Sequence, residues 1–456
     1  MGNTELLLLK LAAVLFIGFI GGQVAKLLKL PNVSGYLVFG LLLGPSVGLI
    51  IPGFEGIITP ADQSSLKFLS EIALAFIAFS IGSEFNIKSI KKSGKEVSIL
   101  TAFEVFGAVA LVFLLMLIVP KPQTFQNSHG LVGYNPFTKP NIAFSMILAS
   151  MSAATAPAAT LMVIRQYRAY GPVTKAILPI TALDDIFGII IFGFFISIAQ
   201  ILVPAPGARE VHVALMIAKP FIEVLGSILI GTIIGYVLSV VGKRFDRERD
   251  DIQILAVGSV ILSIGLISLL NSENVLGQYG ISFSPLLSNI MTGAMVANLT
   301  RRPARTFNAV NDFTTPFYIV FFTMAGASLN LGIIRTEWLI AIISIVYIIA
   351  RGAGKYFGIY VGATVAGSNE NIKKNLGMAL LPQGGVSIGL LVIVSTSMAS
   401  MYPVISTIIM LSVLVYETSG PIFAKLAISR SGEIDGLDKL DQLSSVDDLV
   451  PQIEGE

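Results

Sequence analysis

The sequence predicts an all-α, polytopic membrane protein with thirteen transmembrane helices, twelve of them forming two inverted six-helix repeats. Three observations support this prediction. Hydrophobic residues make up 54% of the 456 residues and charged residues only 13%, and long uncharged stretches recur from residue 4 to residue 427. A short motif of the first half returns in the second half. One apolar stretch in each half is interrupted by Pro or Gly near its centre.

Pro, Gly and charged residues divide the apolar sequence into the expected spans. These spans cover residues 4–28, 34–50, 66–85, 96–119, 141–163, 173–203, 216–242, 252–271, 281–299, 313–332, 336–366, 372–397 and 402–427. The first stretch is too long for a signal peptide and has no small-residue cleavage site, so it is expected to be a span. We expect one transmembrane domain over residues 1–427 and an acidic, disordered cytoplasmic tail over residues 428–456.

The basic residues predict the orientation. They concentrate in alternate loops, near residues 26–29, 88–95, 165–168, 243–249, 301–305 and 373–374. The positive-inside rule therefore places the N-terminus outside the cell membrane and the C-terminus in the cytoplasm. Basic residues in short loops of a chain with net charge +2 argue against nucleic-acid binding. There is no Cys, and both His129 and His212 fall in external loops, so we expect no cofactor.

Glycines at matching positions of the two halves indicate an internal repeat. The third and tenth spans share a motif that aligns Gly82 with Gly326, and less closely Gly40 in the second span aligns with Gly293 in the ninth. Residues 4–203 then repeat as residues 252–427, with 216–242 as a linker helix. Because seven spans separate the partners, the two copies insert in opposite directions, which is a transporter architecture.

The repeat also pairs the fifth span with the twelfth, and both contain helix breakers. Pro157 interrupts the fifth span, and Pro382, Gly384 and Gly385 interrupt the twelfth. Proline removes a backbone donor and glycine loosens a helix, so each span can unwind near the membrane centre. The freed carbonyl groups and half-helix ends could then ligate a cation.

Asp184 and Asp185 lie near the middle of the sixth span. Helix rise places them about 16 Å from its start, which is the middle of a hydrocarbon layer about 30 Å thick. One acid at that depth costs about 2.5–3.5 kcal/mol, and such acids usually mark ion or proton paths. The alternative is a structural polar pair that is held by hydrogen bonds.

Four more charged residues lie deep in the expected spans. Lys355 lies at the depth of the aspartates, and we assign it a functional role because a desolvated lysine changes protonation readily. Glu104, Arg351 and Glu417 could support the site, or they could equally form a structural ion-pair network. The four deep acids outnumber the two deep bases, and the excess negative charge could bind a cation or the protons that replace it.

Several motifs together resemble one family. They are Thr155-Ala-Pro, Ala182-Leu-Asp-Asp-Ile-Phe-Gly188, Ser284-Pro-Leu-Leu, Arg351-Gly-Ala-Gly-Lys355 and Leu381-Pro-Gln-Gly-Gly. With them the chain resembles the bacterial monovalent cation:proton antiporter family, in the branch of NapA-type sodium/proton and Kef-type potassium/proton exchangers. The resemblance runs from Leu30 to Pro421. Gln383, a possible supporting residue, and Gly385 differ from the charged Arg and Glu of the NapA type.

This resemblance implies an NhaA-like antiporter fold that exchanges Na⁺, K⁺ or Li⁺ for protons. If an Asp184–Lys355 pair breaks when the cation binds and Lys355 releases its proton, two protons exchange for one cation, so we expect an electrogenic cycle. It implies that Asp185 is the main proton and cation carboxylate, that Asp184 pairs with Lys355, and that Thr155 lies at the helix crossover beside the transported cation. It also implies a homodimer with core helices over residues 96–203 and 336–427 beside a dimerisation scaffold.

Two other transport functions remain open. The same fold hosts sodium-coupled organic-anion symporters, although the two aspartates argue against an anion as the main cargo. A cation channel is the second alternative, and unitary currents would reveal it. The sequence contains no constellation typical of an enzyme.

Overall fold

The structure, a computed structural model, is all-helical over the part of the chain that it describes. It describes residues 3–436 except 29, 31, 50, 52, 55, 85–93, 132, 134, 157–159, 161–162, 165–166, 205–212, 246–248, 273–274, 277–280 and 301. The expected all-α class is confirmed. Within the described residues, seven helices are long and apolar enough to cross a membrane. The thirteen-span count remains a prediction.

The helices of the first half follow the expected spans closely. They are α1 (Asn3–Leu27), α2 (Asn32–Leu41), η1 (Pro45–Leu49), α3 (Pro60–Ser65), α4 (Lys67–Ile81), η2 (Gly82–Glu84), α6 (Gly94–Ile118), α7 (Gln123–Ser128), α8 (Lys139–Met151), α10 (Pro172–Leu202) and α11 (Val213–Phe245). The expected fifth span is represented by α8, which ends at Met151, short of Pro157.

The second half contains an interrupted span between residues 379 and 385. Its helices are α12 (Arg249–Leu270), α13 (Pro285–Leu299), α14 (Pro303–Ser328), α15 (Ile333–Thr336), α16 (Trp338–Ala366), α17 (Glu370–Ala379), α18 (Gly385–Ser397) and α19 (Tyr402–Arg430). The expected twelfth span is two helices, α17 and α18, separated at Pro382 and Gly384. Helix α14 begins ten residues before the expected span, at Pro303, because proline is well tolerated in a first helical turn.

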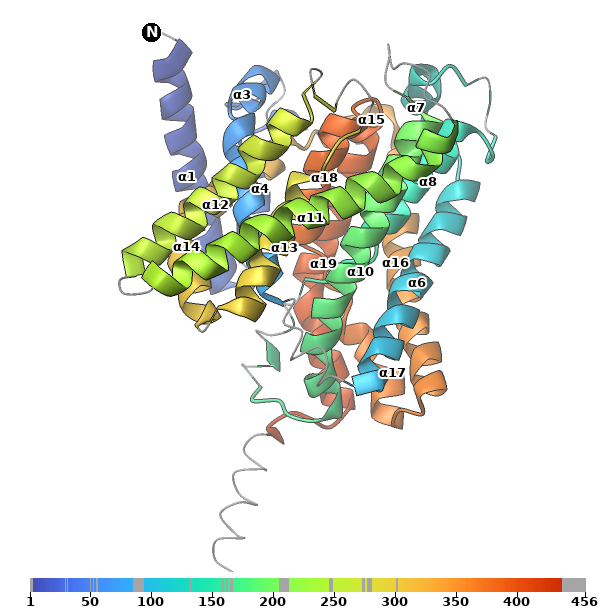
Figure 1. The fold of residues 1–456 in the computed structure, drawn as a ribbon. Helices are drawn as coiled ribbons and strands as arrows, with labels where there is room; N and C mark the ends of the chain where they lie inside the picture. The colour runs from blue at the N-terminus through green and yellow to red at the C-terminus, as the bar shows by residue number, and fades with distance from the viewer. Residues whose placement is uncertain are drawn as a thin grey trace, which may run out of the picture.

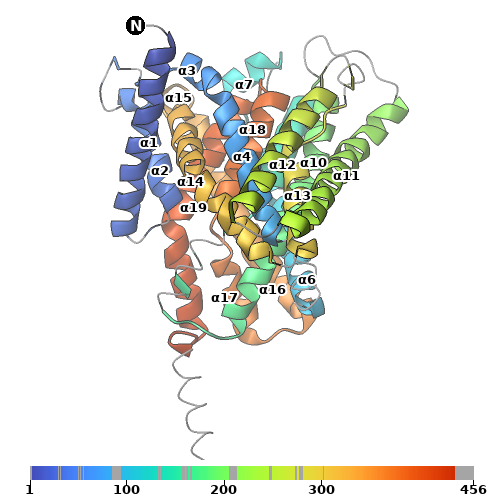
Figure 2. The ribbon, with the colours of Figure 1, turned by 60° about the vertical axis from the view of Figure 1, so that its left-hand side comes forward.

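Helix packing is most extensive within two groups. One group contains α6, α8, α10, α16, α17, α18 and α19, and the other contains α1, α2, α4, α11, α12, α13 and α14. Contacts between α10 and α11 and between α2 and α19 join the groups. In Figure 1, α11 runs obliquely across the molecule, and in Figure 2 α1 and α2 lie on the opposite side from α11 and α12.

The motif glycines lie where the helices of the second group cross. Gly82 packs on Gly293, because a Cβ added to Gly82 would stand 2.7 Å from the Gly293 Cα. Gly326 packs on Gly40 in the same way, with 3.1 Å to the Gly40 Cα. A side chain at either crossing would force the backbones apart, so glycine is required there. Each glycine of one half therefore contacts a glycine of the other half.

The C-terminal end of the chain is ordered further than expected. Helix α19 continues to Arg430, beyond the expected boundary at residue 427, and Glu433 is only 4% exposed. The Glu433 carboxylate accepts hydrogen bonds from the backbone N–H groups of Val173 and Thr174, both at 2.8 Å. It thereby caps the start of α10. The rest of the expected tail, residues 437–456, lies outside the described residues.

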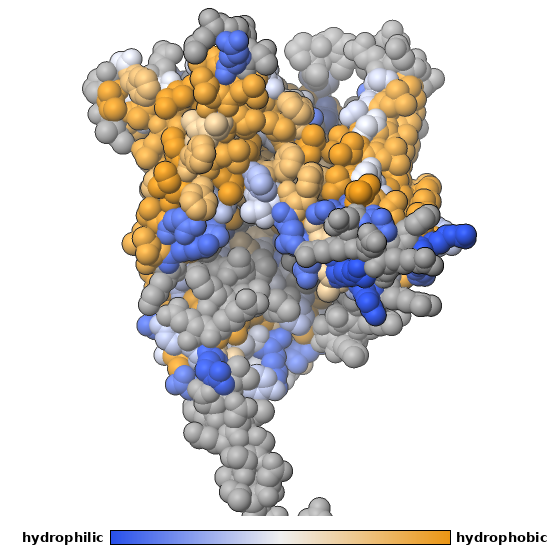
Figure 3. Space-filling view, turned by 90° about the vertical axis from the view of Figure 1, so that its left-hand side faces the viewer, coloured by the Kyte–Doolittle hydropathy of each residue, from blue (hydrophilic) through white to orange (hydrophobic). Residues whose placement is uncertain are grey.

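The outer surface matches a lipid environment. On the face in Figure 3, hydrophobic side chains form a broad region, and hydrophilic side chains gather below it. On α1, for example, Phe16, Phe19 and Leu27 point outward and are more than half exposed. Large exposed apolar side chains on a long apolar helix are typical of contact with lipid.

Candidate functional site

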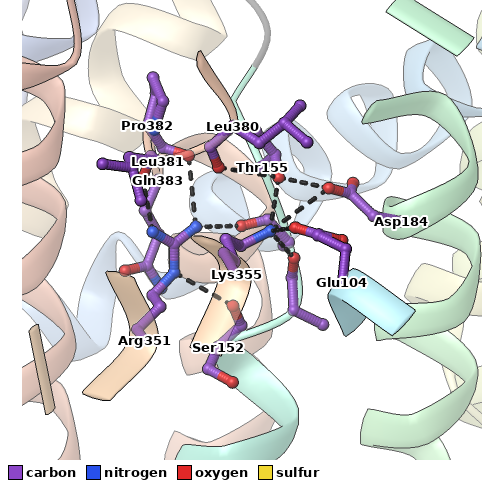
Figure 4. Close-up of polar contacts among 12 residues, drawn as sticks. Glu104, Ser152, Thr155, Asp184, Arg351, Lys355, Leu380, Leu381, Pro382 and Gln383 are labelled. Atoms are coloured by element: carbon purple, nitrogen blue, oxygen red, sulfur yellow. Dashed lines mark hydrogen bonds and ion pairs between the residues drawn. The ribbon is translucent and has the colours of Figure 1, made fainter. Parts of the chain in front are cut away.

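The candidate site lies where the chain passes between α8 and α10 and between α17 and α18. After Met151 and Ala379 the backbone leaves the helical conformation, and the two segments cross. The Ala156 N–H donates to the Pro382 carbonyl at 3.0 Å. The Thr160 hydroxyl donates to the Ala379 carbonyl at 2.9 Å. The two interrupted segments therefore meet within the first group, and Figure 4 shows residues of both segments around Arg351 and Lys355.

Arg351, from α16, ties the two interruptions together. Its guanidinium donates to the carbonyl oxygens of Ser152 at 3.1 Å, Ala154 at 2.7 Å and Pro382 at 3.3 Å, and it also donates to Leu381. These carbonyls lost their helical partners at the breaks, so the fully buried arginine satisfies them. In the described chain its guanidinium forms hydrogen bonds with these carbonyls and forms no ion pair with Glu104 or Glu417.

Lys355 lies one helical turn further along α16 and meets two acids. Its ammonium forms an ion pair with Glu104 and lies 3.4 Å from Asp184 Oδ2. It also donates to the Ala153 carbonyl at 2.6 Å and to the Thr155 hydroxyl at 2.7 Å. The Asp184–Lys355 proximity that the resemblance implied is present. Glu104 is nevertheless the nearer acid, which sequence reasoning did not predict.

The close approach of α6 and α16 explains why Glu104 reaches Lys355. A Cβ on Gly354 would stand 2.6 Å from the Ala108 Cα, and one on Gly107 would stand 2.7 Å from the Gly354 carbonyl oxygen. Small residues let the two backbones pack at short range, as they do in many membrane helix pairs. Glycines spaced along both spans were the sequence signal that could have identified this pairing.

Both aspartates lie on α10, and Asp184 faces the crossing. Asp184 is fully buried and Asp185 is buried. The Thr155 hydroxyl donates to Asp184 Oδ2. In the described part of the chain, Asp184 Oδ1 and Glu104 Oε2 are buried and accept no hydrogen bond. Buried carboxylate oxygens with available lone pairs can accept a proton or ligate a cation.

Gln383 and Glu417 lie on the other side of the crossing. The Gln383 amide donates to the Met151 carbonyl at 3.1 Å and accepts from the Ser412 hydroxyl at 2.7 Å, so a neutral residue bridges both breaks. Glu417 is buried on α19 and lies against Gly384, where an added Cβ would stand 2.2 Å from its Oε1. The structure thus brings Glu104, Thr155, Asp184, Arg351 and Lys355 together, and it separates Glu417 from Lys355.

The charges of this cluster do not balance. Lys355 and Arg351 provide two positive charges against three acids, Glu104, Asp184 and its sequence neighbour Asp185, and all five side chains are buried. Buried acids are tolerated only when partners, protons or cations neutralise them. The arrangement can therefore bind and release a small cation or protons. Among the described residues there is no group of three or more His, Cys, Asp and Glu side chains that could hold a bound metal ion.

Comparison with known proteins identifies the family of the chain. The family model described as "Sodium/hydrogen exchanger, transmembrane" matches residues 12–425. The Na(+)/H(+) antiporter NhaS4 of Synechocystis is 24% identical, with 89% of this chain and 96% of that protein covered. The ammonium/H(+) antiporter subunit AmhT of Alkalihalophilus pseudofirmus is 22% identical, with 82% and 83% covered.

The fold is also shared. The structure of the sodium proton antiporter MjNhaP1 from Methanocaldococcus jannaschii superposes with a TM-score of 0.68 at 16% identity, covering 94% of this chain and all of that chain. At this identity the likeness concerns the fold alone. Because the family match extends over nearly the whole membrane part, the chain belongs to the sodium/hydrogen exchanger family of transmembrane proteins.

Proposed function

We propose that this protein is a secondary active antiporter that exchanges a monovalent cation for protons across the cell membrane. The observation that carries the proposal is the Lys355 ammonium held between Glu104 and Asp184 where two interrupted helices cross. Na⁺ is the first candidate cation because two relatives are named Na(+)/H(+) antiporters. K⁺, Li⁺ and, from the name of AmhT, NH₄⁺ are the others.

The exchange follows from competition for the same oxygens. A cation and protons both bind Asp185 and Asp184, with the Thr155 hydroxyl as a further oxygen ligand, so each displaces the other. Arg351 holds the crossing backbone in place during this exchange, since it stays charged and keeps its carbonyl partners. If only the occupied site crosses the membrane, exchange is obligatory.

The exchange is electrogenic in this proposal. The sequence led us to expect that Lys355 changes its protonation, but Lys355 keeps Glu104 as a partner when Asp184 changes its charge, so in this proposal the ammonium stays protonated. Asp184 and Asp185 can then carry two protons in one direction and one monovalent cation in the other. One net charge crosses in each cycle, which couples transport to the membrane potential by about 2.3 kcal/mol per 100 mV.

The movement is a displacement of one helix group against the other. In this proposal α6, α8, α10 and α16 to α19 form the mobile core, and the remaining long helices form a scaffold that pairs with a second copy in a homodimer. The glycine contacts Gly82–Gly293 and Gly40–Gly326 support two inverted repeats, because a two-fold relation between the repeats exchanges one contact with the other. The N-terminus lies outside and the C-terminus in the cytoplasm.

The decisive experiment is Asp185→Asn in proteoliposomes that report internal pH. The amide keeps the shape of the side chain but cannot take up a proton, so cation-driven dissipation of a pH gradient should fall to the level of empty liposomes. Asp251→Asn, the same substitution near the start of α12, is the control and should exchange like the wild type. Persistent exchange in the Asp185 variant would contradict the proposal.

The two alternative functions give different signals in the same liposomes. A symporter would accumulate an organic anion when Na⁺ is supplied, with no need for a proton gradient. A channel would pass unitary currents far above the turnover of an exchanger. Neither signal is expected from the wild-type protein.

A further inference from the structure

Glu417 is a buried acid at the boundary between the two helix groups. It lies near the middle of α19, about 20 Å along the helix from each end. Only 3% of the residue is exposed. Helix α19 packs against α16, α17 and α18 of its own group and against α2 of the other group.

The side chain of Glu417 lies between the crossing and α2. On the first side, Oε1 packs directly on Gly384, and the Ala156 Cβ lies 3.0 Å from the position that a Cβ on Gly384 would take. On the second side, the carboxylate interacts with the hydroxyl of Ser34 of α2, a residue that is 2% exposed. The surroundings of Glu417 therefore change whenever the first group moves against the second.

The carboxylate of Glu417 has no cationic partner among the described residues. Helices α2 and α18 carry no Asp, Glu, Lys, Arg or His. On α16, Arg351 is bound to the carbonyls of the crossing and Lys355 is paired with Glu104. The remaining charges on α8 and α17, which also pack against α19, lie near the starts of these helices and are Lys139, Glu370, Lys373 and Lys374.

The oxygens of the contact between Glu417 and Ser34 are not saturated with hydrogen bonds. In the described part of the chain, Glu417 Oε2 and Ser34 Oγ are buried and neither takes part in a hydrogen bond of normal distance and angle. A buried carboxylate without a base is neutralised by a proton or by a cation. A dehydrated monovalent cation needs a shell of oxygen atoms, whereas the side chains here supply one carboxylate and one hydroxyl. The contact therefore favours a proton.

We propose that Glu417 binds a proton while α19 packs against α2 and releases it to water when the two groups move apart. The inference rests on the proposed function, which supplies this movement. On release the carboxyl O–H bond breaks, the proton passes to a water molecule, and the carboxylate stays on α19. Because one proton is linked to the packing, the ratio of open to packed protein rises by up to about tenfold for each unit of pH. Glu417 thereby makes the cycle depend on pH at a place separate from Asp184 and Asp185.

The test is the reactivity of Ser34→Cys toward N-ethylmaleimide in proteoliposomes that contain the full chain. The chain has no native Cys, so the introduced thiol is the only one. The reference is Ser429→Cys, on an exposed turn of the same helix as Glu417, and dividing the two labelling rates removes the ordinary effect of pH on a thiol. From about pH 6.5 to about pH 8.5 this ratio should rise at least about fivefold. A negative charge beside the thiol would slow its reaction, so the rise reports opening.

Glu417→Gln is the decisive variant, because its amide keeps the shape of the side chain but cannot release a proton. In that background the ratio of the two rates should stay within about twofold over the same pH range. An equal rise with Glu and with Gln would overturn the proposal. So would a constant ratio in the protein that keeps Glu417, and this second comparison is available even if Glu417→Gln fails to fold.

Two further measurements separate the remaining outcomes. Na⁺ that suppresses the labelling of Ser34→Cys in the Asp185→Asn background, but no longer does so once Glu417→Gln is added, would show a cation at Glu417 and overturn the assignment of a proton. Cation-driven proton flux is measured in liposomes of the wild type. Its absence would overturn the proposed function, whereas the labelling ratio decides on Glu417 alone.

Discussion

We predict that Glu104→Gln changes the unfolding free energy differently depending on whether Lys355 is present. Each single substitution removes one partner of a buried pair, which costs about 3–5 kcal/mol when the remaining charge has no other partner. Glu104→Gln leaves Lys355 with Asp184 at 3.4 Å. That remaining contact is worth about 5 kcal/mol of attraction at an effective dielectric constant of 20, before desolvation is subtracted. We therefore expect Glu104→Gln to cost only about 1–3 kcal/mol.

Lys355→Gln has a larger expected cost, because it leaves Glu104 and Asp184 close together without a base between them. We expect a loss of about 3–5 kcal/mol. In that background Glu104→Gln should raise stability, since it removes one of two uncompensated acids. The effect of the same substitution thus changes sign, so the coupling energy exceeds the cost of Glu104→Gln in the wild type.

The assay is denaturant-induced unfolding of the four proteins in detergent. Trp338, the only tryptophan, begins the helix that carries Lys355 and provides a fluorescence signal. Circular dichroism checks that the helical content of the variants is retained. The reasoning is refuted if Glu104→Gln changes the unfolding free energy equally in both backgrounds, within about 0.5 kcal/mol.

Four further predictions concern orientation, the C-terminus and the transport cycle. An impermeant thiol reagent added outside cells should label Ser128→Cys and not Glu370→Cys, and the opposite pattern would reverse the orientation. Glu433→Gln should lower the unfolding free energy by about 1–2 kcal/mol, because it weakens a buried cap of α10. The control is Glu337→Gln, which weakens an exposed cap of α7 and should be nearly neutral, and equal effects of the two substitutions would contradict this prediction. The apparent cation KM should increase as pH falls, because protons compete for the same carboxylates, and a flat KM from about pH 8.5 to pH 6.5 would favour separate paths. Cation-driven proton flux should respond to an imposed membrane potential, and flux that ignores the potential would indicate one-for-one exchange.

Glu433 shows why the boundary of the membrane domain was not predictable. The sequence after residue 427 is acidic and lacks apolar periodicity, which favours a tail. In the fold, Gly171 leaves room for the Glu433 carboxylate, because a Cβ there would stand 2.3 Å from the Glu433 Cδ. The cap joins positions 260 residues apart, so no local pattern announces it.

The sequence by itself determined the class of the protein and the two interrupted spans, and it predicted the depth of the charged residues. The physical reason is that a hydrocarbon layer demands about 20 apolar residues for each spanning helix, so a proline, glycine or charge within such a stretch is conspicuous. Asp184, Asp185 and Lys355 could be singled out on this ground alone. The partners of these residues could not be predicted, because they come from the helices that pack against them in the fold.

Only the tertiary structure decided how those charges are shared. It paired Lys355 with Glu104, 251 positions away, because glycines let α6 and α16 approach closely. It assigned Arg351 to four carbonyl oxygens, which become available only when both helices break at the same place. It also placed Glu417 between the crossing and Ser34 of α2, a helix from the start of the chain. Each of these contacts depends on packing between segments, and the apolar pattern of a membrane helix carries little information about its neighbours.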